Sequence, residues 1–203
     1  MSQVFDPSQP PADPFSLFGD WFEEAVAQES VDPNAMTVAT VDANGRPSAR
    51  ILLMKHVDSD GFVFYSNLES RKGSALAANP VAALCFHWKS LSRQVRVEGP
   101  VSPVTDAEAD EYFASRPRGS RIGAWASQQS RPLDHRDTLI ARTKEIESRF
   151  PDETVDRPPH WSGYRLAPDY IEFWMNGEFR LHDRLVYTRP NSDEPWSTTI
   201  LYP

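Results

Sequence analysis

Cationic side chains gather at one short stretch of the sequence. Arg71 and Lys72 follow Ser70, a favourable N-cap residue, so the two cations would lie in the first turn of a helix. Cations oppose the helix dipole at this end unless an anion binds nearby. Free N–H groups, a hydroxyl and two cations could together hold a phosphate. A solvated basic helix start accounts for the same residues equally well.

A second basic segment covers residues 115–125. It contains three arginines, two serines and no carboxylate, although the whole chain has a net charge of −8. An unpaired basic segment in an acidic chain favours an anion-binding role. The alternative is a solvated basic loop.

A third group lies near the C-terminus. A strand is predicted over residues 178–188, and its alternation would place Arg180, His182 and Arg184 on one face, about 7 Å apart. An anion could lie between the histidine and the two arginines. The alternative is the solvent-facing side of a hairpin.

The composition limits the classes of function. With 203 residues and 39% apolar content the chain can fill one core, and we expect a flexible arm over residues 1–12 and a single domain over residues 13–203. The acidic balance argues against nucleic acid and anionic membranes as partners. The one cysteine, Cys85, excludes an internal disulfide. No apolar run approaches the ~20 residues of a membrane span, and no signal peptide is recognisable, so a cytoplasmic location is expected.

The hydrophobic pattern predicts an α+β fold built mainly from antiparallel strands. Turn signals at Asn44-Gly45, at residues 58–61 and at Asn176-Gly177 predict hairpins. Polarity on alternate positions suggests a sheet that curls into a small barrel. Strands are expected over residues 35–41, 47–55, 62–65, 81–88, 93–98, 162–166, 170–174 and 178–188. Helices are expected from residue 14, over 70–78, over 105–115 and over 137–150.

Two of these elements carry predictions about burial. The continuous apolar run Val81 to Trp88 predicts a central strand buried on both faces. The helix over residues 137–150 is expected to bury Leu139, Thr143, Ile146 and Phe150.

Motifs for self-sufficient catalysis are absent from the sequence. The five histidines form no zinc-binding spacing, and there is no Gly-x-Ser-x-Gly elbow, Walker loop or Gly-x-Gly-x-x-Gly. The side chains thus offer binding more than chemistry. If the protein is an enzyme, a bound cofactor would carry the reaction, and the cationic groups indicate that cofactor or substrate is phosphorylated.

Several motifs in this order resemble the pyridoxamine 5'-phosphate oxidases, over about residues 13–203. They are Arg-Ile-Leu-Leu-Met-Lys (50–55), Phe-Tyr-Ser-Asn-Leu-Glu-Ser-Arg-Lys (64–72), Tyr-Phe-Ala-Ser-Arg-Pro-Arg (112–118), Ile-Gly-Ala-Trp-Ala-Ser (122–127), Ile-Glu-Phe-Trp (171–174) and Arg-Leu-His-Asp-Arg (180–184). The resemblance implies an FMN-binding split β-barrel with peripheral helices. It also implies a homodimer with FMN bound across the subunit interface.

The resemblance further assigns residues by position. It implies that Arg71 and Lys72 bind the FMN phosphate and that the catalytic residues Arg180 and His182 face the reactive end of the substrate pyridine. The implied FMN-binding residues are Arg50, Ile51, Leu52, Leu53, Met54, Lys55, Tyr65, Ser66, Arg71, Lys72, Gln94, Gln129, Ser130, Trp174 and Arg184. The implied substrate-binding residues are Lys55, Tyr112, Arg116, Ser120, Arg180, Leu181 and His182. No metal is implied.

One pair in these sets conflicts with a regular strand. Arg50 and Lys55 differ in parity and would point to opposite faces. A bulge between them, or FMN contacts made by the backbone, would remove the conflict.

The implied reaction converts pyridoxamine 5'-phosphate and pyridoxine 5'-phosphate to pyridoxal 5'-phosphate. O2 is the acceptor, and H2O2 and, from the amine, NH3 are released. Two features depart from the family pattern: residues 1–12 contain neither Arg nor Tyr, and Ile200 stands where an arginine is usual. Two alternatives remain open, a related flavin oxidase of another pathway, such as the phenazine-type enzymes, and a non-catalytic carrier of flavin or pyridoxal phosphate.

Overall fold

The computed structural model describes residues 6–7 and 9–203. The expected N-terminal arm lies partly outside these residues. Within its described part, the Tyr187 hydroxyl donates to the Pro11 carbonyl at 2.9 Å. No helix of the described residues is long and apolar enough to cross a membrane.

The first half of the chain forms the strands and helices that carry the first cationic group. In order these are α1 (Pro14–Gln28), β1 (Ala35–Val41), β2 (Pro47–Leu53), β3 (His56–Asp58), β4 (Gly61–Asn67), α2 (Arg71–Ala78), β5 (Val81–Trp88) and β6 (Arg93–Pro103). The second half adds α3 (Asp106–Ser115), α4 (Arg118–Ala126), α5 (Arg136–Arg149), β7 (Trp161–Leu166), β8 (Tyr170–Met175), the 3-10 turn η1 (Glu178–Arg180), β9 (Asp183–Thr188) and β10 (Ser197–Ile200).

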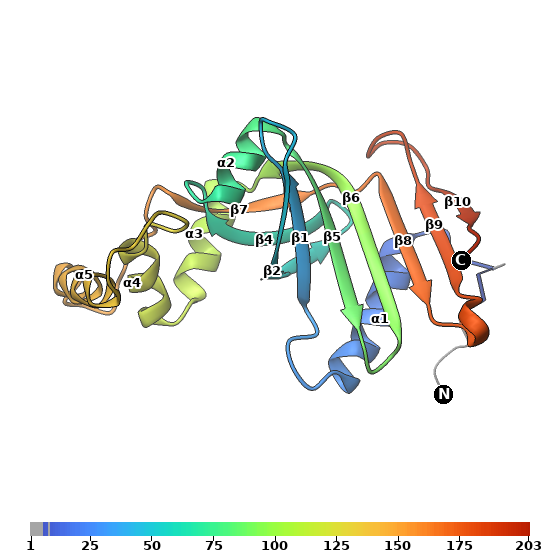
Figure 1. The fold of residues 1–203 in the computed structure, drawn as a ribbon, viewed down its shortest axis with the longest axis horizontal. Helices are drawn as coiled ribbons and strands as arrows, with labels where there is room; N and C mark the ends of the chain where they lie inside the picture. The colour runs from blue at the N-terminus through green and yellow to red at the C-terminus, as the bar shows by residue number, and fades with distance from the viewer. Residues whose placement is uncertain (1–5, 8) are drawn as a thin grey trace.

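The strands form one antiparallel sheet that curls into a half-barrel (Figure 1). Seven of them follow the order β10-β9-β8-β6-β5-β1-β2, while β4 pairs with β3 and β7. Strand β6 joins the two parts, since it pairs with β5 and β8 near its start and with β7 near its end. The predicted α+β, mainly antiparallel split barrel is therefore confirmed.

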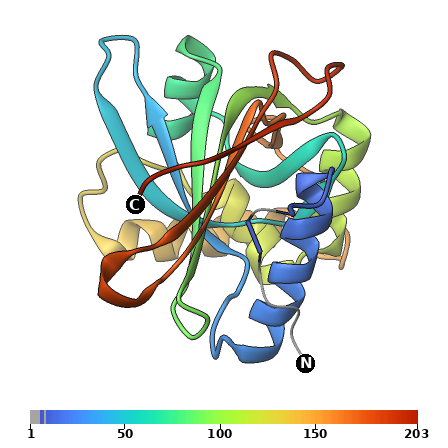
Figure 2. The same ribbon diagram turned by 90° about the vertical axis from the view of Figure 1, so that its right-hand side faces the viewer.

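Helix α1 covers the inner face of the sheet (Figure 2). The helix begins at residue 14, as the sequence predicts, and its N-cap Asp13 accepts a hydrogen bond from the Phe15 amide at 3.0 Å. Phe18 is fully buried and makes edge-to-face contacts with Phe62 (4.9 Å) and Phe86 (5.2 Å). These aromatic contacts make the central core a rigid support for the strands that carry the polar groups.

The outer face of the sheet is open in the single chain. Strand β5 lies centrally, between β1 and β6, but its burial alternates, with Cys85 half-buried and His87 exposed. The prediction that Val81–Trp88 is buried on both faces is therefore wrong for one chain. Val81 and, on β2, Ile51 remain 51% and 63% exposed. An apolar sheet face of this kind indicates a surface that another element or chain covers.

The helices α3, α4 and α5 gather at one end of the molecule (Figure 1). Helix α4 was not predicted from the sequence, and it forms because Ile122 and Ala126 pack into a second core with Trp161. Helix α5 forms as predicted but buries only Ile146, while Leu139 is 37% exposed and Thr143 and Phe150 are partly buried. The helix contacts the second core through a narrow face, so the sequence analysis overestimated how many of its side chains are buried.

The turn between β8 and β9 differs most from the sequence prediction. Residues 178–182 do not continue a strand, because Phe179 and Arg180 have φ values of 55° and 66°. Positive φ angles break strand alternation, so Arg180, His182 and Arg184 do not share one strand face. The short strand β10, which pairs with β9, was not predicted.

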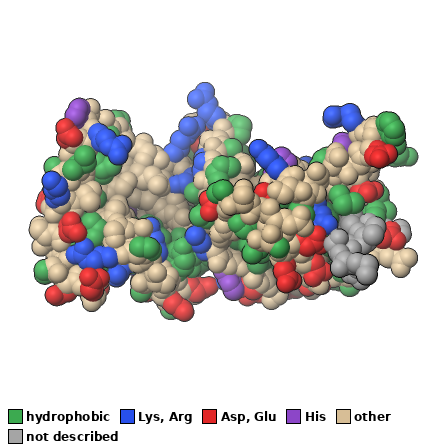
Figure 3. Space-filling view, turned by 90° about the horizontal axis from the view of Figure 1, so that it is seen from below, with side chains coloured by type: hydrophobic (Ala, Val, Ile, Leu, Met, Phe, Trp, Pro, Cys, Tyr) green, Lys and Arg blue, Asp and Glu red, His purple; other side chains and the backbone are tan. Residues whose placement is uncertain are grey.

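Charges of both signs are interspersed on the face seen from below (Figure 3). Lys and Arg side chains are spread along its whole length beside Asp and Glu, and do not gather in one patch. On this face the exposed charges therefore define no anion site.

Candidate functional site

The first cationic group centres on Lys72, at the start of α2. Its side chain is buried (7% exposed), and Nζ donates to Ser66 Oγ (2.7 Å), Ser70 Oγ (3.2 Å) and Gln129 Oε1 (2.7 Å). All three acceptors are neutral, and no carboxylate among the described residues pairs with this ammonium group. A buried charge without a counterion is costly, so the site is suited to an anion.

Electrostatics supports the same interpretation. Burial, reinforced by the positive charge of Arg50, lowers the pKa of Lys72 to about 8. The pKa of Arg50 is itself lowered, by burial and by neighbouring Arg71. Arg50 donates to the Val38 carbonyl (3.0 Å) and Thr40 Oγ1 (2.9 Å), again to neutral oxygens. Arg71 and Lys72 thus lie at the N-terminus of α2, as the sequence predicted, and Arg50 joins them as a third cation.

The neighbouring backbone explains the parity of Arg50 and Lys55. Arg50 pairs in register with Val38, which is fully buried, so it points toward the inner face. Strand β2 ends at Leu53, two residues before the predicted end, and Lys55 N donates to the Val63 carbonyl at 2.8 Å. The chain therefore turns from β2 onto β4 between the two cations, which removes the conflict with strand alternation.

The second cationic group surrounds Arg116. Its guanidinium carbon lies 4.8 Å from the ring centroid of Trp161, and burial lowers the pKa of Arg116. Nη1 is buried without a hydrogen-bond partner among the described residues. The adjoining rings of Tyr65 and Tyr112 stack at 4.1 Å, and Lys55 Nζ lies 5.9 Å from the Tyr112 centroid. An unpartnered buried donor on a cation is suited to an anionic ligand.

The other arginines of this segment differ in their surroundings. Arg118 pairs with Glu147 (2.9 Å) and donates to the Phe150 carbonyl, so its role is structural. Ser120 is exposed on α4, two residues beyond Arg118. Arg121, like Arg116, keeps a buried nitrogen, Nε, without a hydrogen-bond partner among the described residues. The structure thus separates Arg116 and Arg121 from the paired Arg118, a distinction that the sequence could not make.

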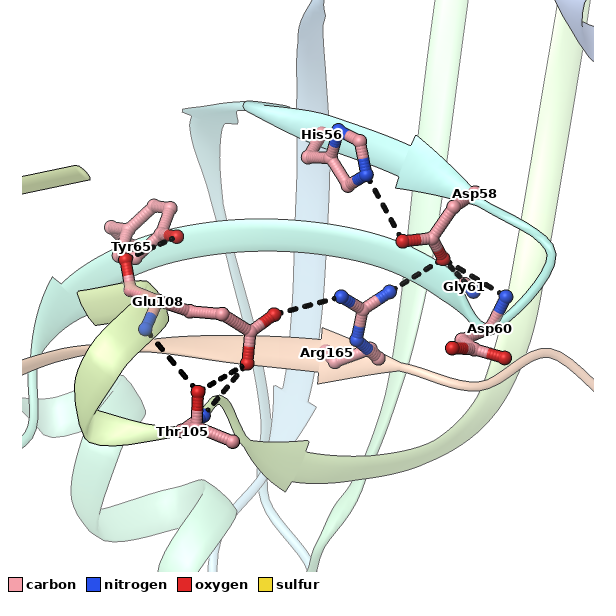
Figure 4. Close-up of polar contacts among 8 residues, drawn as sticks. All are labelled: His56, Asp58, Asp60, Gly61, Tyr65, Thr105, Glu108 and Arg165. Atoms are coloured by element: carbon pink, nitrogen blue, oxygen red, sulfur yellow. Dashed lines mark hydrogen bonds and ion pairs between the residues drawn. The ribbon is translucent and has the colours of Figure 1, made fainter. Parts of the chain in front are cut away.

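Arg165 of β7 holds α3 in place and was not identified from the sequence. It lies between Asp58 and Glu108, donating to a carboxylate oxygen of each (Figure 4). Glu108 also closes the capping box with Thr105, and Tyr65 donates to the Glu108 carbonyl at 3.4 Å. Arg165 therefore fixes the helix that carries Tyr112. A cavity of about 400 Å³ lies between these elements.

The third group lies across β6, β8 and β9. Gln94, Trp174 and Arg184 stand opposite one another in register, and the rings of Trp174 and His182 are 4.6 Å apart. Arg184 Nε donates to the buried Glu172 at 2.8 Å, a partner that sequence reasoning missed. Arg180 is exposed.

The structure brings some predicted site residues together and keeps others apart. Lys72, Ser66 and Gln129 converge, and Lys55, Tyr112 and Arg116 converge. Figure 1 places α3 and α4 toward one end of the long axis and the β8–β9 turn toward the other, with α2, which carries Lys72, between them. Within a single chain, the turn that carries Arg180 and His182 therefore does not reach either of the other groups. Among the remaining residues, Met54 is buried, Leu52 and Leu53 are partly buried, and Ile51, Ser130 and Leu181 are exposed.

Comparison with solved structures defines the class of fold. PhzG from Burkholderia lata 383, in complex with tetrahydrophenazine-1-carboxylic acid, matches with a TM-score of 0.92 and 31% identity, covering 99% of this chain and 98% of that one. A pyridoxamine 5'-phosphate oxidase-related, FMN binding protein from Nostoc punctiforme matches with a TM-score of 0.76 over 96% of this chain and 100% of that chain, at 17% identity. The fold is the split barrel of flavin-binding proteins.

The sequence comparisons then define the family. Residues 22–150 match the family model described as pyridoxamine 5'-phosphate oxidase, and residues 161–203 match the pyridoxine 5'-phosphate oxidase C-terminal dimerisation region. Pyridoxine/pyridoxamine 5'-phosphate oxidases of Maricaulis maris and Rhodospirillum rubrum are 56% and 59% identical. They cover 100% and 94% of this chain, which spans 89% and 96% of their lengths. The chain belongs to the pyridoxamine 5'-phosphate oxidase family.

Proposed function

We propose that this protein is an FMN-dependent oxidase that converts pyridoxamine 5'-phosphate and pyridoxine 5'-phosphate to pyridoxal 5'-phosphate. The observation that carries the proposal is the presence of two separate unpaired cation sites, at Lys72 and at Arg116. A phosphorylated cofactor and a phosphorylated substrate each need one such site. The family membership and the names of relatives 56–59% identical support the same reaction.

The residues around Lys72 fit the phosphate of FMN. Lys72 and Arg71 would neutralise its charge, Arg50 would add a third cation, and Ser66 and Gln129 would hold its oxygens or orient Lys72. When bound, FMN would accept a hydride from substrate C4' and pass the electrons to O2, which yields H2O2. The protein's own contribution is to fix the flavin at one end through these contacts.

The residues around Arg116 fit the substrate phosphate. Arg116 has a free buried donor, while Lys55 and the hydroxyls of Tyr112 and Ser120 lie on neighbouring elements. The Trp161 ring holds the guanidinium in place by a cation–π contact. A phosphate anchored here would fix the distance from the substrate's reacting carbon to the flavin.

The active site is completed by a second copy of the chain. The open apolar face of β5 and the match of residues 161–203 to a dimerisation region support a homodimer. In that assembly Arg180 and His182 of the partner subunit would approach the substrate's amine or alcohol. FMN would then lie across the interface, beside the row of Gln94, Trp174 and Arg184. We also infer a cytoplasmic location, supported by the single cysteine.

A second candidate is an oxidase of another ring substrate, favoured by the similarity to PhzG. The purified protein should show flavin absorbance and release peroxide with pyridoxamine 5'-phosphate or pyridoxine 5'-phosphate. Bound flavin without turnover of either compound would overturn the proposal, leaving the second candidate or a non-catalytic carrier.

A further inference from the structure

Glu172 of β8 is a buried carboxylate at the centre of a group of polar side chains. It is 2% exposed and accepts hydrogen bonds from Arg184 Nε (2.8 Å), Arg96 Nη1 (3.1 Å) and the Tyr170 hydroxyl (3.0 Å). Against the effect of burial, hydrogen bonds from Arg184 and Tyr170 lower the pKa of Glu172, so the carboxylate is ionised at neutral pH. Three donors from β6, β8 and β9 thus hold one buried charge in a fixed position.

Arg184 of β9 is held at two of its three guanidinium nitrogens. Nε donates to Glu172, and Nη1 donates to the Tyr202 carbonyl at 3.0 Å. The Leu201 amide in turn donates to the Arg184 carbonyl at 2.9 Å, which ties the C-terminal segment to β9. Nη2 makes no hydrogen bond to any residue that the structure describes. Because a guanidinium is planar, fixing two of its nitrogens sets the direction of the third.

The same arginine belongs to the row beside which FMN is proposed to lie. Arg184 stands in register with Trp174, and Trp174 stands in register with Gln94. Glu172 precedes Trp174 by two residues on β8, so it lies on the same sheet face, about 7 Å from that row. One negative charge is therefore fixed close to the row, where it balances the charge of Arg184.

We propose that Glu172 is a positioning residue for the flavin ring: it holds Arg184 so that Nη2 faces the ring, and its charge offsets that of the arginine. The group contacted would be a carbonyl oxygen or ring nitrogen that accepts a hydrogen bond from a guanidinium. This inference deepens the proposed function and rests on its flavin-binding part alone. Failure of the protein to bind flavin would refute the proposed function, whereas flavin binding that is independent of Glu172 would refute only this inference.

Flavin affinity tests the positioning role without turnover. Glu172→Gln keeps the size of the side chain but removes the charge that holds Arg184, so the flavin-free protein should bind FMN and riboflavin about tenfold more weakly. Equal losses are expected because the two ligands share the ring that Arg184 would contact. Fluorescence titration gives both Kd values. An unchanged affinity for riboflavin would overturn the inference.

Glu98 provides a matched control in the same group of side chains. It accepts from Arg96 Nη2 at 2.6 Å and makes no hydrogen bond or ion pair with Arg184 among the described residues. Glu98→Gln removes the same charge from a more exposed pair and should change both Kd values by less than about twofold. An equal loss of affinity in Glu98→Gln and Glu172→Gln would indicate a general effect of charge and contradict the positioning role.

Glu172→Asp separates position from charge. The shorter side chain keeps the negative charge but draws the carboxylate away from Arg184, so flavin affinity should fall as in Glu172→Gln. The reduction potential of the bound flavin should rise in Glu172→Gln only, because that variant loses a negative charge close to a ring that gains electrons.

Two results of these measurements would contradict the inference. One is a reduction potential that Glu172→Gln leaves unchanged, and the other is a Glu172→Asp variant that binds flavin as tightly as the unmodified protein. Glu172→Asp keeps the buried group charged, so its flavin affinity decides the positioning role even if Glu172→Gln does not fold. Thermal unfolding of the flavin-free variants shows whether each one folds.

Discussion

The Lys72 group and the β8–β9 turn differ in how far one chain completes them. Lys72 is 7% exposed and has three hydrogen-bond partners from β4, the α2 cap and the loop after α4. In the turn, by contrast, Phe179 and Leu181 are 91% and 70% exposed, and the backbone takes unfavourable φ angles. In the first region one chain supplies all of these contacts. The second needs a surface to cover it.

This difference indicates that the two regions have different roles. We propose that each chain binds the phosphate groups by itself, because the buried Lys72 is held by contacts within one chain. The groups proposed to face the reacting atoms, Arg180 and His182, lie on a largely exposed turn, from which they would reach a site in another copy. The predictions that follow test the two halves of this comparison separately.

The largest effect is expected for Lys72→Met. Loss of a charge-assisted contact worth about 1.5–3 kcal/mol should weaken FMN binding by roughly 10- to 100-fold. The flavin-free variant should be at least as stable as the unmodified protein, because a buried charge without a counterion is removed. Flavin fluorescence titration and thermal unfolding measure the two effects. Lys89→Met, at an exposed lysine, is the control and should change neither.

Arg116→Ala should raise KM for pyridoxamine 5'-phosphate by about tenfold or more, since the phosphate contact is charge-assisted. Flavin content should not change. Arg118→Ala is the matched control, because Arg118 is paired with Glu147 in the same segment. Steady-state peroxide assays give both KM values. Equal effects of the two substitutions would remove Arg116 from the substrate site.

The pKa of Lys72 predicts a pH dependence of flavin binding. Because this pKa is lowered from 10.5 to about 8, affinity of the flavin-free protein for FMN should fall above pH 8, by up to about tenfold per pH unit. The unfolded chain binds more protons between these values, so stability of the flavin-free protein should rise with pH through that window. Riboflavin, which lacks the phosphate, is the control ligand. An equal pH dependence for riboflavin would contradict the assignment.

The smallest effect is expected at Arg165. Arg165→Gln should destabilise the protein by about 1–2 kcal/mol, because two partly exposed ion pairs to Asp58 and Glu108 are lost. Against the effect of burial, hydrogen bonds from Arg165 and the Asp60 amide lower the pKa of Asp58, while the pKa of Glu108 is lowered first by Thr105 and then by Arg165. The difference from the unmodified protein should therefore shrink as pH falls below about 4. Urea unfolding at two pH values measures this difference in the free energy of unfolding.

Local chemistry explains which parts of the fold were predictable. Ser70 and Thr105 cap helices through bonds to residues three positions away, and these short-range signals were interpreted correctly. The turn at Phe179 was not predicted, because nothing about a phenylalanine in the sequence indicates a positive φ angle. The burial of Leu139 depends on which neighbours pack against its helix.

The candidate site shows the same limit. Convergence of Lys72 with Gln129 was implied by the family resemblance, yet nothing in residues 115–125 distinguishes unpaired Arg116 from paired Arg118. The partner of Arg118 lies 29 residues away, and Arg165 meets Asp58 across 107 residues. Pairings at such separations depend on the tertiary fold. The roles of the site residues toward FMN and substrate remain predictions.

Mixing two inactive variants tests the shared site most directly. Lys72→Met and Arg180→Ala should each abolish most activity in homodimers. If the site takes Lys72 from one chain and Arg180 from the other, co-expression gives mixed dimers with one intact site, and random pairing restores about one quarter of the activity. If both residues served a site within one chain, every site would keep one defect. Activity no higher than that of the two variants alone would contradict a site completed by the partner subunit.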